Sequence, residues 1–292
     1  MIPFPSPSTH RPEPPTHSNF HRPFLERAGS SLGHDSGQHC LGAFLTMRLV
    51  DQFAAQYEDI NTEATAYQIR ATEDFIRNLH PQTAEVKSLL EIVRMASTAM
   101  QEGDRRVLFP PLLAFAYWLE DDLRLDEALD VLETTTQLSD ATDGDQEVAT
   151  FLQKARVLRL GGYFDHATEA YALAGEMAAR IGDYHSERLS RVGRAIVMQK
   201  TGNLADSEKA LRQIRSDCVA AGDVIAEAHC CQDLAVALHL MRRSQEAVPL
   251  LFRASQLYEA PLARARALSD TGVLLKELGY LEAAEHAFSL VL

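Results

Sequence analysis

The chain has 292 residues, with 28 Lys or Arg against 41 Asp or Glu, so its formal net charge is −13. This acidic excess argues against an autonomous nucleic-acid-binding protein, because such proteins need a basic surface that displaces counterions from phosphates. Four cysteines without the spacing of a disulfide framework or a zinc site favour a reducing, cytoplasmic environment. No uncharged apolar stretch reaches the length of about 20 residues that crosses a bilayer, so we expect no membrane contact.

Residues 1–46 differ in composition from the rest of the chain. They hold seven of the 12 prolines and five of the 11 histidines, and their apolar residues show no periodicity. We therefore expect a disordered tail rich in Pro, Ser and His. A helical pattern then begins at Met47. We hypothesise that this methionine is the native start and that the tail is not part of the native protein.

Residues 47–108 are predicted to form the N-terminal helices. From residue 47 onward, apolar residues recur at spacings of three and four, which indicates helices and no strands. One helix is expected over residues 63–80, ending at Pro81, and another over residues 84–102. Whether this pair is a degenerate repeat aligned on Ser88 is left open.

Residues 109–292 contain five copies of an internal repeat. A small residue near the start of each predicted second helix recurs after 39, 40, 40 and 37 residues. These residues are Ala128, Ala167, Ser207, Ala247 and Ala284. Twelve positions before each lies another small residue, and these are Ala116, Ala155, Ala195, Ala235 and Gly272. Small residues on two antiparallel helices let their backbones approach closely, while large apolar residues one turn away fill the space on either side.

The repeat resembles the tetratricopeptide repeat. Residues 161–167 (Gly-Gly-Tyr-Phe-Asp-His-Ala) and 278–284 (Leu-Gly-Tyr-Leu-Glu-Ala-Ala) are the closest matches to the family's turn. The period is longer than the family's usual length of about 34 residues and is similar to the variant in bacterial maltose-activator-type regulators. The resemblance implies an all-α fold, a right-handed α-solenoid of antiparallel helix pairs, whose concave face binds a protein or peptide without catalysis.

The same resemblance singles out candidate peptide-binding residues, because in the family the concave wall comes from first-helix positions after the small residue. The candidates are Arg156, Arg159, Gln199, Lys200, His239 and Lys276. We expect Arg156 and Arg159 on one helix face, and Lys200 and Lys276 on neighbouring first helices. Such a basic stripe would receive an acidic side chain or a C-terminal carboxylate of the partner. The alternative is that these side chains are solvated surface charges.

No catalytic residue, cofactor site or metal site is predicted. Residues 29–33 spell a nucleophile elbow, but they lie in the predicted tail and not at a strand-to-helix turn. The aspartates around Gly144 lack the ligand spacing of a calcium loop. No second cysteine pair completes a tetrahedral set with His229, Cys230, Cys231 and His239. We therefore interpret these residues as buried structural thiols and a histidine that lines the groove.

The sequence stops inside the predicted second helix of the fifth repeat, at the apolar residues 290–292. We hypothesise that the chain is a fragment of a longer protein, or that this edge docks another subunit. The leading functional hypothesis is a non-enzymatic scaffold that binds a protein or peptide. The alternative is the sensory or regulatory region of a longer signalling or transcription-regulating protein whose output domain lies beyond residue 292.

Overall fold

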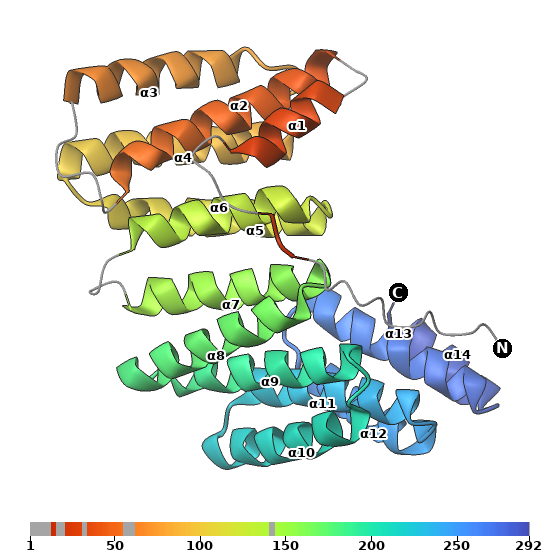
Figure 1. The fold of residues 1–292 in the computed structure, drawn as a ribbon. Coiled ribbons are helices and arrows are strands. Elements are labelled where there is room, and N and C mark those ends of the chain that lie inside the picture. The colour runs from red at the N-terminus through yellow and green to blue at the C-terminus, as the bar shows by residue number, and fades with distance from the viewer. Residues whose placement is uncertain (1–12, 16–20, 31–33, 55–61, 140–143, 292) are drawn as a thin grey trace. The chain divides into compact units, whose positions relative to one another are not determined.

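The computed structural model describes residues 13–15, 21–30, 34–54, 62–139 and 144–291. These residues form fourteen α-helices and two 3-10 helices, and no strand occurs among them (Figure 1). In chain order the elements are α1 (Arg22–Ser30), α2 (His34–Val50), η1 (Asp51–Phe53), α3 (Thr62–Arg77), α4 (Ala84–Glu102), η2 (Arg105–Leu108), α5 (Phe109–Asp121), α6 (Leu125–Leu138), α7 (Gly144–Leu160), α8 (Phe164–Ile181), α9 (Tyr184–Lys200), α10 (Leu204–Ala221), α11 (Val224–Leu240), α12 (Ser244–Leu257), α13 (Pro261–Glu277) and α14 (Leu281–Ser289).

The chain divides into two compact units, Met1–Ala170 and Tyr171–Leu292, with the boundary inside α8. Within each unit, consecutive helices pack against one another, as expected for an all-α helical-repeat solenoid. The predicted all-α fold is confirmed. No helix among the described residues combines the length and the apolar character needed to cross a membrane.

In the first unit, α3 packs against α4 and α5 against α6. Ala116 of α5 and Ala128 of α6 are completely buried, as the repeat pattern predicts. The sequence placed a helix over residues 84–102, and α4 has these bounds. Ser88, on which a degenerate repeat would be aligned, is only half-buried. The α3–α4 pair is therefore present, but its position aligned with Ala128 is less buried than Ala128 itself.

In the second unit, α9 and α10, α11 and α12, and α13 and α14 form the predicted helix pairs. The close approach inside a pair is direct between α9 and α10, because the Ser207 hydroxyl donates a hydrogen bond of 2.8 Å to the backbone carbonyl of Ala195. In the last pair, Gly272 faces Phe288, whose ring lies 2.7 Å from where a Cβ would be. The small and large positions of the repeat therefore pack together as the sequence predicts.

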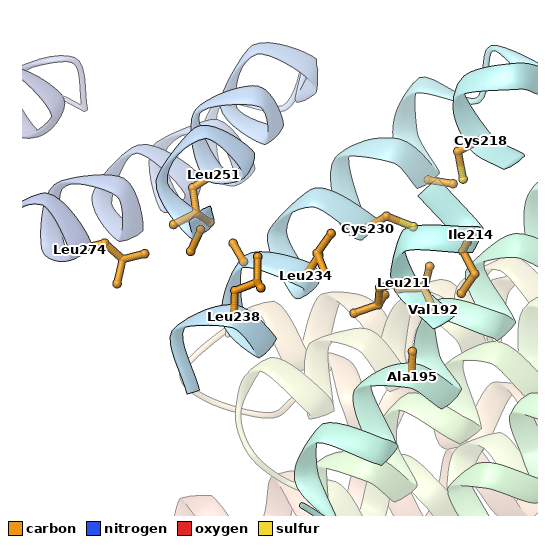
Figure 2. Close-up of a cluster of buried hydrophobic side chains, with 13 residues drawn as sticks. Val192, Ala195, Leu211, Ile214, Cys218, Cys230, Leu234, Leu238, Leu251 and Leu274 are labelled. Atoms are coloured by element: carbon orange, nitrogen blue, oxygen red, sulfur yellow. The ribbon is translucent and has the colours of Figure 1, made fainter. Parts of the chain in front are cut away.

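The core of the second unit is an apolar cluster to which five consecutive helices, α9 to α13, contribute side chains. Figure 2 shows Val192 and Leu211 at one end and Leu251 and Leu274 at the other. Cys218 and Cys230 are buried in the same cluster, so these two thiols belong to the core.

Local signals explain where the helices of this unit begin and end. Gly202, between α9 and α10, has φ +88°, and Gly222, after α10, has φ +69°. Side-chain-bearing residues rarely adopt this left-handed conformation, so glycine is favoured at both helix ends. Asp223 follows immediately, and its carboxylate accepts a hydrogen bond from the backbone N–H of Ala226, which caps α11.

The expectation of a disordered tail over residues 1–46 is wrong for residues 22–30 and 34–46. These form α1 and most of α2, in which Phe24, Ala43 and Met47 are buried. Helix α2 runs through Met47, so the helix does not begin at this methionine. The prediction rested on the proline content of the whole segment. Six of the seven prolines precede residue 21, however, and both helices lie after it. Residues 1–12, 16–20 and 31–33 are outside the described residues.

Candidate binding surface

In the first unit, the predicted pair Arg156 and Arg159 lies on α7. The Arg156 Nε donates a hydrogen bond of 2.6 Å to Oε1 of Glu120 on α5. Glu120 is buried, so Arg156 compensates a carboxylate that has been removed from water. Arg156 therefore connects two first helices, and an incoming acidic group would have to compete with Glu120. Arg159 is half-buried on the same helix.

In the second unit, Gln199 is not a surface residue. Its side chain is 6% exposed, and its Nε2 donates a hydrogen bond of 2.9 Å to the backbone carbonyl of Asp233 on α11. The prediction that Gln199 contacts a ligand is therefore corrected: this amide connects α9 to α11. The neighbouring Lys200 is exposed at the end of α9.

His239 lies at the end of α11 and also makes contacts within the protein. Its Nδ1 is 2.9 Å from the hydroxyl of Ser244, the first residue of α12, and 3.8 Å from a carboxylate oxygen of Glu277 on α13. Lys276 is exposed beside Glu277. Lys200 and Lys276 lie on α9 and α13, and α11 comes between these helices in the chain. They are therefore not on neighbouring first helices, contrary to the prediction.

Equivalent repeat positions expose apolar side chains that the list of polar candidates did not include. The residue after the small one is Tyr117 in α5, Val236 in α11 and Val273 in α13, with exposed fractions of 49%, 40% and 47%. Ile196, the counterpart in α9, is half-buried. In the second unit, the surface formed by Ile196, Lys200, Val236, His239, Val273 and Lys276 combines aliphatic and basic groups. We call this set the first-helix surface.

Inter-repeat contacts in the second unit converge on Asp223. Its carboxylate is 3.0 Å from Nδ1 of His185 and 3.1 Å from Nη1 of Arg188, both on α9. Burial alone would raise the pKa of Asp223, but the backbone N–H of Ala226 and these two side chains lower it. A Gly-Asp pair recurs at residues 182–183 and 222–223, and in both copies the aspartate caps the helix that follows, so the sequence carried a signal for the cap.

In the first unit, an ion cluster with the buried side chains of His21, Asp51 and Asp130 connects the N-terminal helices to α6. His21 Nδ1 lies 2.6 Å from Oδ2 of Asp130 on α6, and His21 Nε2 lies 3.1 Å from Oδ2 of Asp51 in η1. Burial alone would lower the pKa of His21, but the two carboxylates raise it to about 9. The ring is therefore an imidazolium that donates to both carboxylates. Arg48 adds a hydrogen bond of 2.8 Å to Asp51.

A second buried cluster lies where α6 begins. Arg124 Nη1 donates a hydrogen bond of 2.6 Å to Oε1 of Glu85 on α4, and its Nε donates to Glu127. The guanidinium also lies 5.3 Å from the centre of the Trp118 ring, which is a favourable cation–π contact. Burial raises the pKa of Glu127, although Arg124 opposes this change. Both clusters are structural connections between helices.

The residues considered as metal ligands do not form a ligand set. Cys230 and Cys231 are completely buried, and burial raises the pKa of both thiols. His229 Nδ1 instead lies 3.1 Å from the hydroxyl of Tyr258. Within the described part of the chain, no three His, Cys, Asp or Glu side chains are grouped so that they could hold a metal ion.

Comparisons with known proteins support the fold only. No protein-family model and no curated protein sequence matches the chain. Among solved structures, the crystal structure of BtubC (BKLC) from P. vanneervenii is similar, with a TM-score of 0.52 and 16% sequence identity. The alignment covers 70% of this chain and 87% of that chain. At this identity the similarity describes a shared helical architecture.

Proposed function

We propose that the protein is a non-enzymatic helical-repeat scaffold, similar to tetratricopeptide proteins, that binds a protein or peptide. The observation that carries the proposal is the exposure of Val236 and Val273 at equivalent positions of α11 and α13. Burying an aliphatic side chain against a partner is favourable by about 25 cal/mol per Å² of apolar surface. A repeat that places such side chains on successive first helices offers a partner several equivalent contacts.

The charges of the first-helix surface favour a partner with acidic groups. Lys200 and Lys276 are exposed cations in a chain whose net charge is −13. His239 lies close to Glu277, so a carboxylate of the partner would replace the carboxylate of Glu277 as the acidic neighbour of this histidine. We therefore propose that the partner is an extended segment with aliphatic side chains and acidic groups, recognised by hydrophobic contacts and by charge.

We also propose that the protein works in the cytoplasm, in signal transduction. The four cysteines are free thiols and all are buried, which fits a reducing compartment. The alternative role, as the regulatory region of a longer signalling or transcription-regulating protein, stays a prediction. Reading the gene beyond the codon for residue 292 tests it directly, because an output domain would follow.

Substitutions on the first-helix surface test the scaffold function. The double variant Val236→Glu/Val273→Glu places acidic groups on two exposed positions, so the helices keep their buried contacts. Val219→Glu is the matched control, because Val219 is exposed on α10, outside the first-helix surface. Each variant is used as bait in affinity purification from the native cell, followed by quantitative mass spectrometry.

The proposal expects a partner that the wild-type chain and Val219→Glu recover equally and that Val236→Glu/Val273→Glu recovers at least tenfold less. A charge variant, Lys200→Glu/Lys276→Glu, should weaken recovery of the same partner, and the loss should shrink at high salt. Equal recovery by all four chains would refute the first-helix surface as the binding site.

A further inference from the structure

Two contacts between α11 and α13 bound the part of the first-helix surface that carries Val236 and Val273. At one end, the side chain of Gln232 on α11 hydrogen-bonds to the carboxylate of Asp270 on α13. At the other end, His239 of α11 lies 3.8 Å from a carboxylate oxygen of the last residue of α13. Both valines are exposed, and each lies between these two contacts on its own helix. Val236 and Val273, which we call the valine patch, therefore lie on two first helices that meet before and after them.

Asp270 borders the valine patch and is accessible to a partner. The residue is exposed to solvent. Because the backbone of a helix is covered by its own turns, this exposed surface belongs mainly to the side chain. Gln232 orients the carboxylate, since its own Oε1 accepts a hydrogen bond of 2.7 Å from the hydroxyl of Tyr258. The carboxylate is therefore held on one side by α11 and open to solvent on the other.

No described Lys, Arg or His side chain forms an ion pair with Asp270. This includes Arg266, which lies one turn earlier on α13. Partial burial of the carboxyl raises the pKa of Asp270, and the hydrogen bond with Gln232 offsets this rise only in part. A second aspartate, Asp233, occupies the equivalent position of α11, two residues before the small residue of the repeat. This end of the valine patch is therefore acidic.

The opposite end of the valine patch carries a cation. Lys276 is exposed and follows Asp270 by six residues, which corresponds to about 9 Å along the axis of α13. Val273 lies midway between these two charges in the sequence. An extended chain advances about 3.3 Å per residue, so roughly three residues of a partner would span the same distance.

We propose that Asp270 binds a basic side chain of the partner, a lysine or an arginine. This inference rests on the proposed scaffold function and adds a second charge to its partner. The partner segment then has a basic residue over Asp270, aliphatic side chains over the valine patch and an acidic residue near Lys276. The basic group supplies the opposite charge that Asp270 lacks within the protein, and it donates charge-assisted hydrogen bonds to the carboxylate.

A phage-displayed library of random dodecapeptides is the probe that tests this role. The library is selected on the wild-type chain, on Asp270→Asn and on Asp206→Asn. Asp270→Asn keeps the size of the side chain and removes its charge. Asp206 is exposed on α10, outside the first-helix surface, so Asp206→Asn is the matched control. Far-UV circular dichroism checks that both variants are folded.

We expect the wild-type chain and Asp206→Asn to select aliphatic peptides that contain Lys or Arg, and Asp270→Asn to select aliphatic peptides without this preference. The consensus peptide and a copy with Gln in place of the basic residue are then compared by fluorescence anisotropy. Replacing the basic residue should weaken binding to the wild-type chain about threefold, as expected for a solvent-accessible ion pair. The same replacement should leave binding to Asp270→Asn unchanged.

The outcomes separate this inference from the scaffold function on which it rests. If no chain enriches any peptide, both the peptide-binding function and the role of Asp270 are overturned. Enriched peptides without a basic residue, or the same basic preference on Asp270→Asn, would overturn the role of Asp270 alone. Equal binding of the consensus peptide to Val236→Glu/Val273→Glu would place it outside the valine patch and would also overturn the inference.

Discussion

His21 Nδ1 lies 2.6 Å from Oδ2 of Asp130, a residue 109 positions later in the chain, and both side chains are buried. The other ring nitrogen faces Asp51, which follows α2 directly. One imidazolium thus ties the start of α1 and the end of α2 to α6. Removing the charge of this imidazolium would leave the buried carboxylates of Asp51 and Asp130 with less positive charge to balance them. The attachment of the N-terminal helices therefore depends on the protonation of the His21 ring.

The first prediction is that stability falls at alkaline pH through His21. Its pKa is raised from 6.5 to about 9 in the folded chain. The stabilisation is therefore fully present below pH 6.5 and is lost as the pH rises through about 9. Its size is about 3 kcal/mol, since each pKa unit corresponds to about 1.4 kcal/mol.

Urea denaturation followed by circular dichroism between neutral and alkaline pH measures this loss. His21→Gln is the control, because glutamine keeps hydrogen-bonding groups without a titrating charge. This variant should be less stable than wild type at neutral pH and should lack most of the alkaline decrease. The same alkaline decrease in His21→Gln would assign the effect to other groups.

The second prediction concerns Arg124, whose side chain is buried between Glu85 and Glu127. Arg124→Met removes the cation and leaves both carboxylates buried, which should lower the free energy of unfolding by about 3–5 kcal/mol. Arg106→Met is the matched control, because Arg106 pairs with Asp104 at an exposed position. That control should not change the urea midpoint measurably. Similar midpoints for both variants would mean that the buried cluster contributes little.

The third prediction tests the packing of the second unit at Gly193. A Cβ at this position would lie 2.2 Å from the ring of Tyr171, so the ring would have to move. Gly193→Ala should therefore lower the free energy of unfolding by about 1–3 kcal/mol. In the double variant Gly193→Ala/Tyr171→Leu the aromatic ring is absent, so the overlap is relieved. Its loss of unfolding free energy should therefore be smaller than the sum of the losses in the two single variants. Additive effects in this double-mutant cycle would argue against the contact.

The repeats could be predicted from the sequence because their signal is local and periodic. Ala128 and Ala247 each lie in the first turn of a second helix and are completely buried, as their spacing predicts. The attachment of the N-terminal helices could not be predicted in this way, because His21 meets its partners 30 and 109 positions away. No pattern within one helix reports such a pair.

The candidate surface was predicted only in part, for a related reason. The exposed positions of Lys200 and Lys276 follow from helical periodicity. The burial of Gln199 does not, because it depends on a backbone carbonyl that the next repeat presents. Likewise, the pairing of Arg156 depends on Glu120 in the preceding first helix. Contacts between repeats decide which polar groups stay available to a partner.

The last prediction uses the cysteines as reporters of the N-terminal attachment. Cys40 on α2 and Cys230 on α11 are both buried, and burial raises the pKa of each thiol. Both should therefore react slowly with an alkylating reagent in the native chain, since the thiolate is the nucleophile. Cys40 lies close enough to Glu127 of α6 for that carboxylate to raise its pKa further, so its protection depends on how α2 meets α6.

His21→Gln should therefore accelerate alkylation of Cys40 severalfold while leaving Cys230, which belongs to the other unit, unchanged. Alkylation is followed by mass spectrometry of peptides after timed quenching, and urea-unfolded chain gives the rate of the exposed thiols. Equal acceleration at both cysteines would indicate global destabilisation, and no acceleration at Cys40 would show that α2 stays attached without the imidazolium. Selective acceleration at Cys40 is the result expected if His21 holds the N-terminal helices in place.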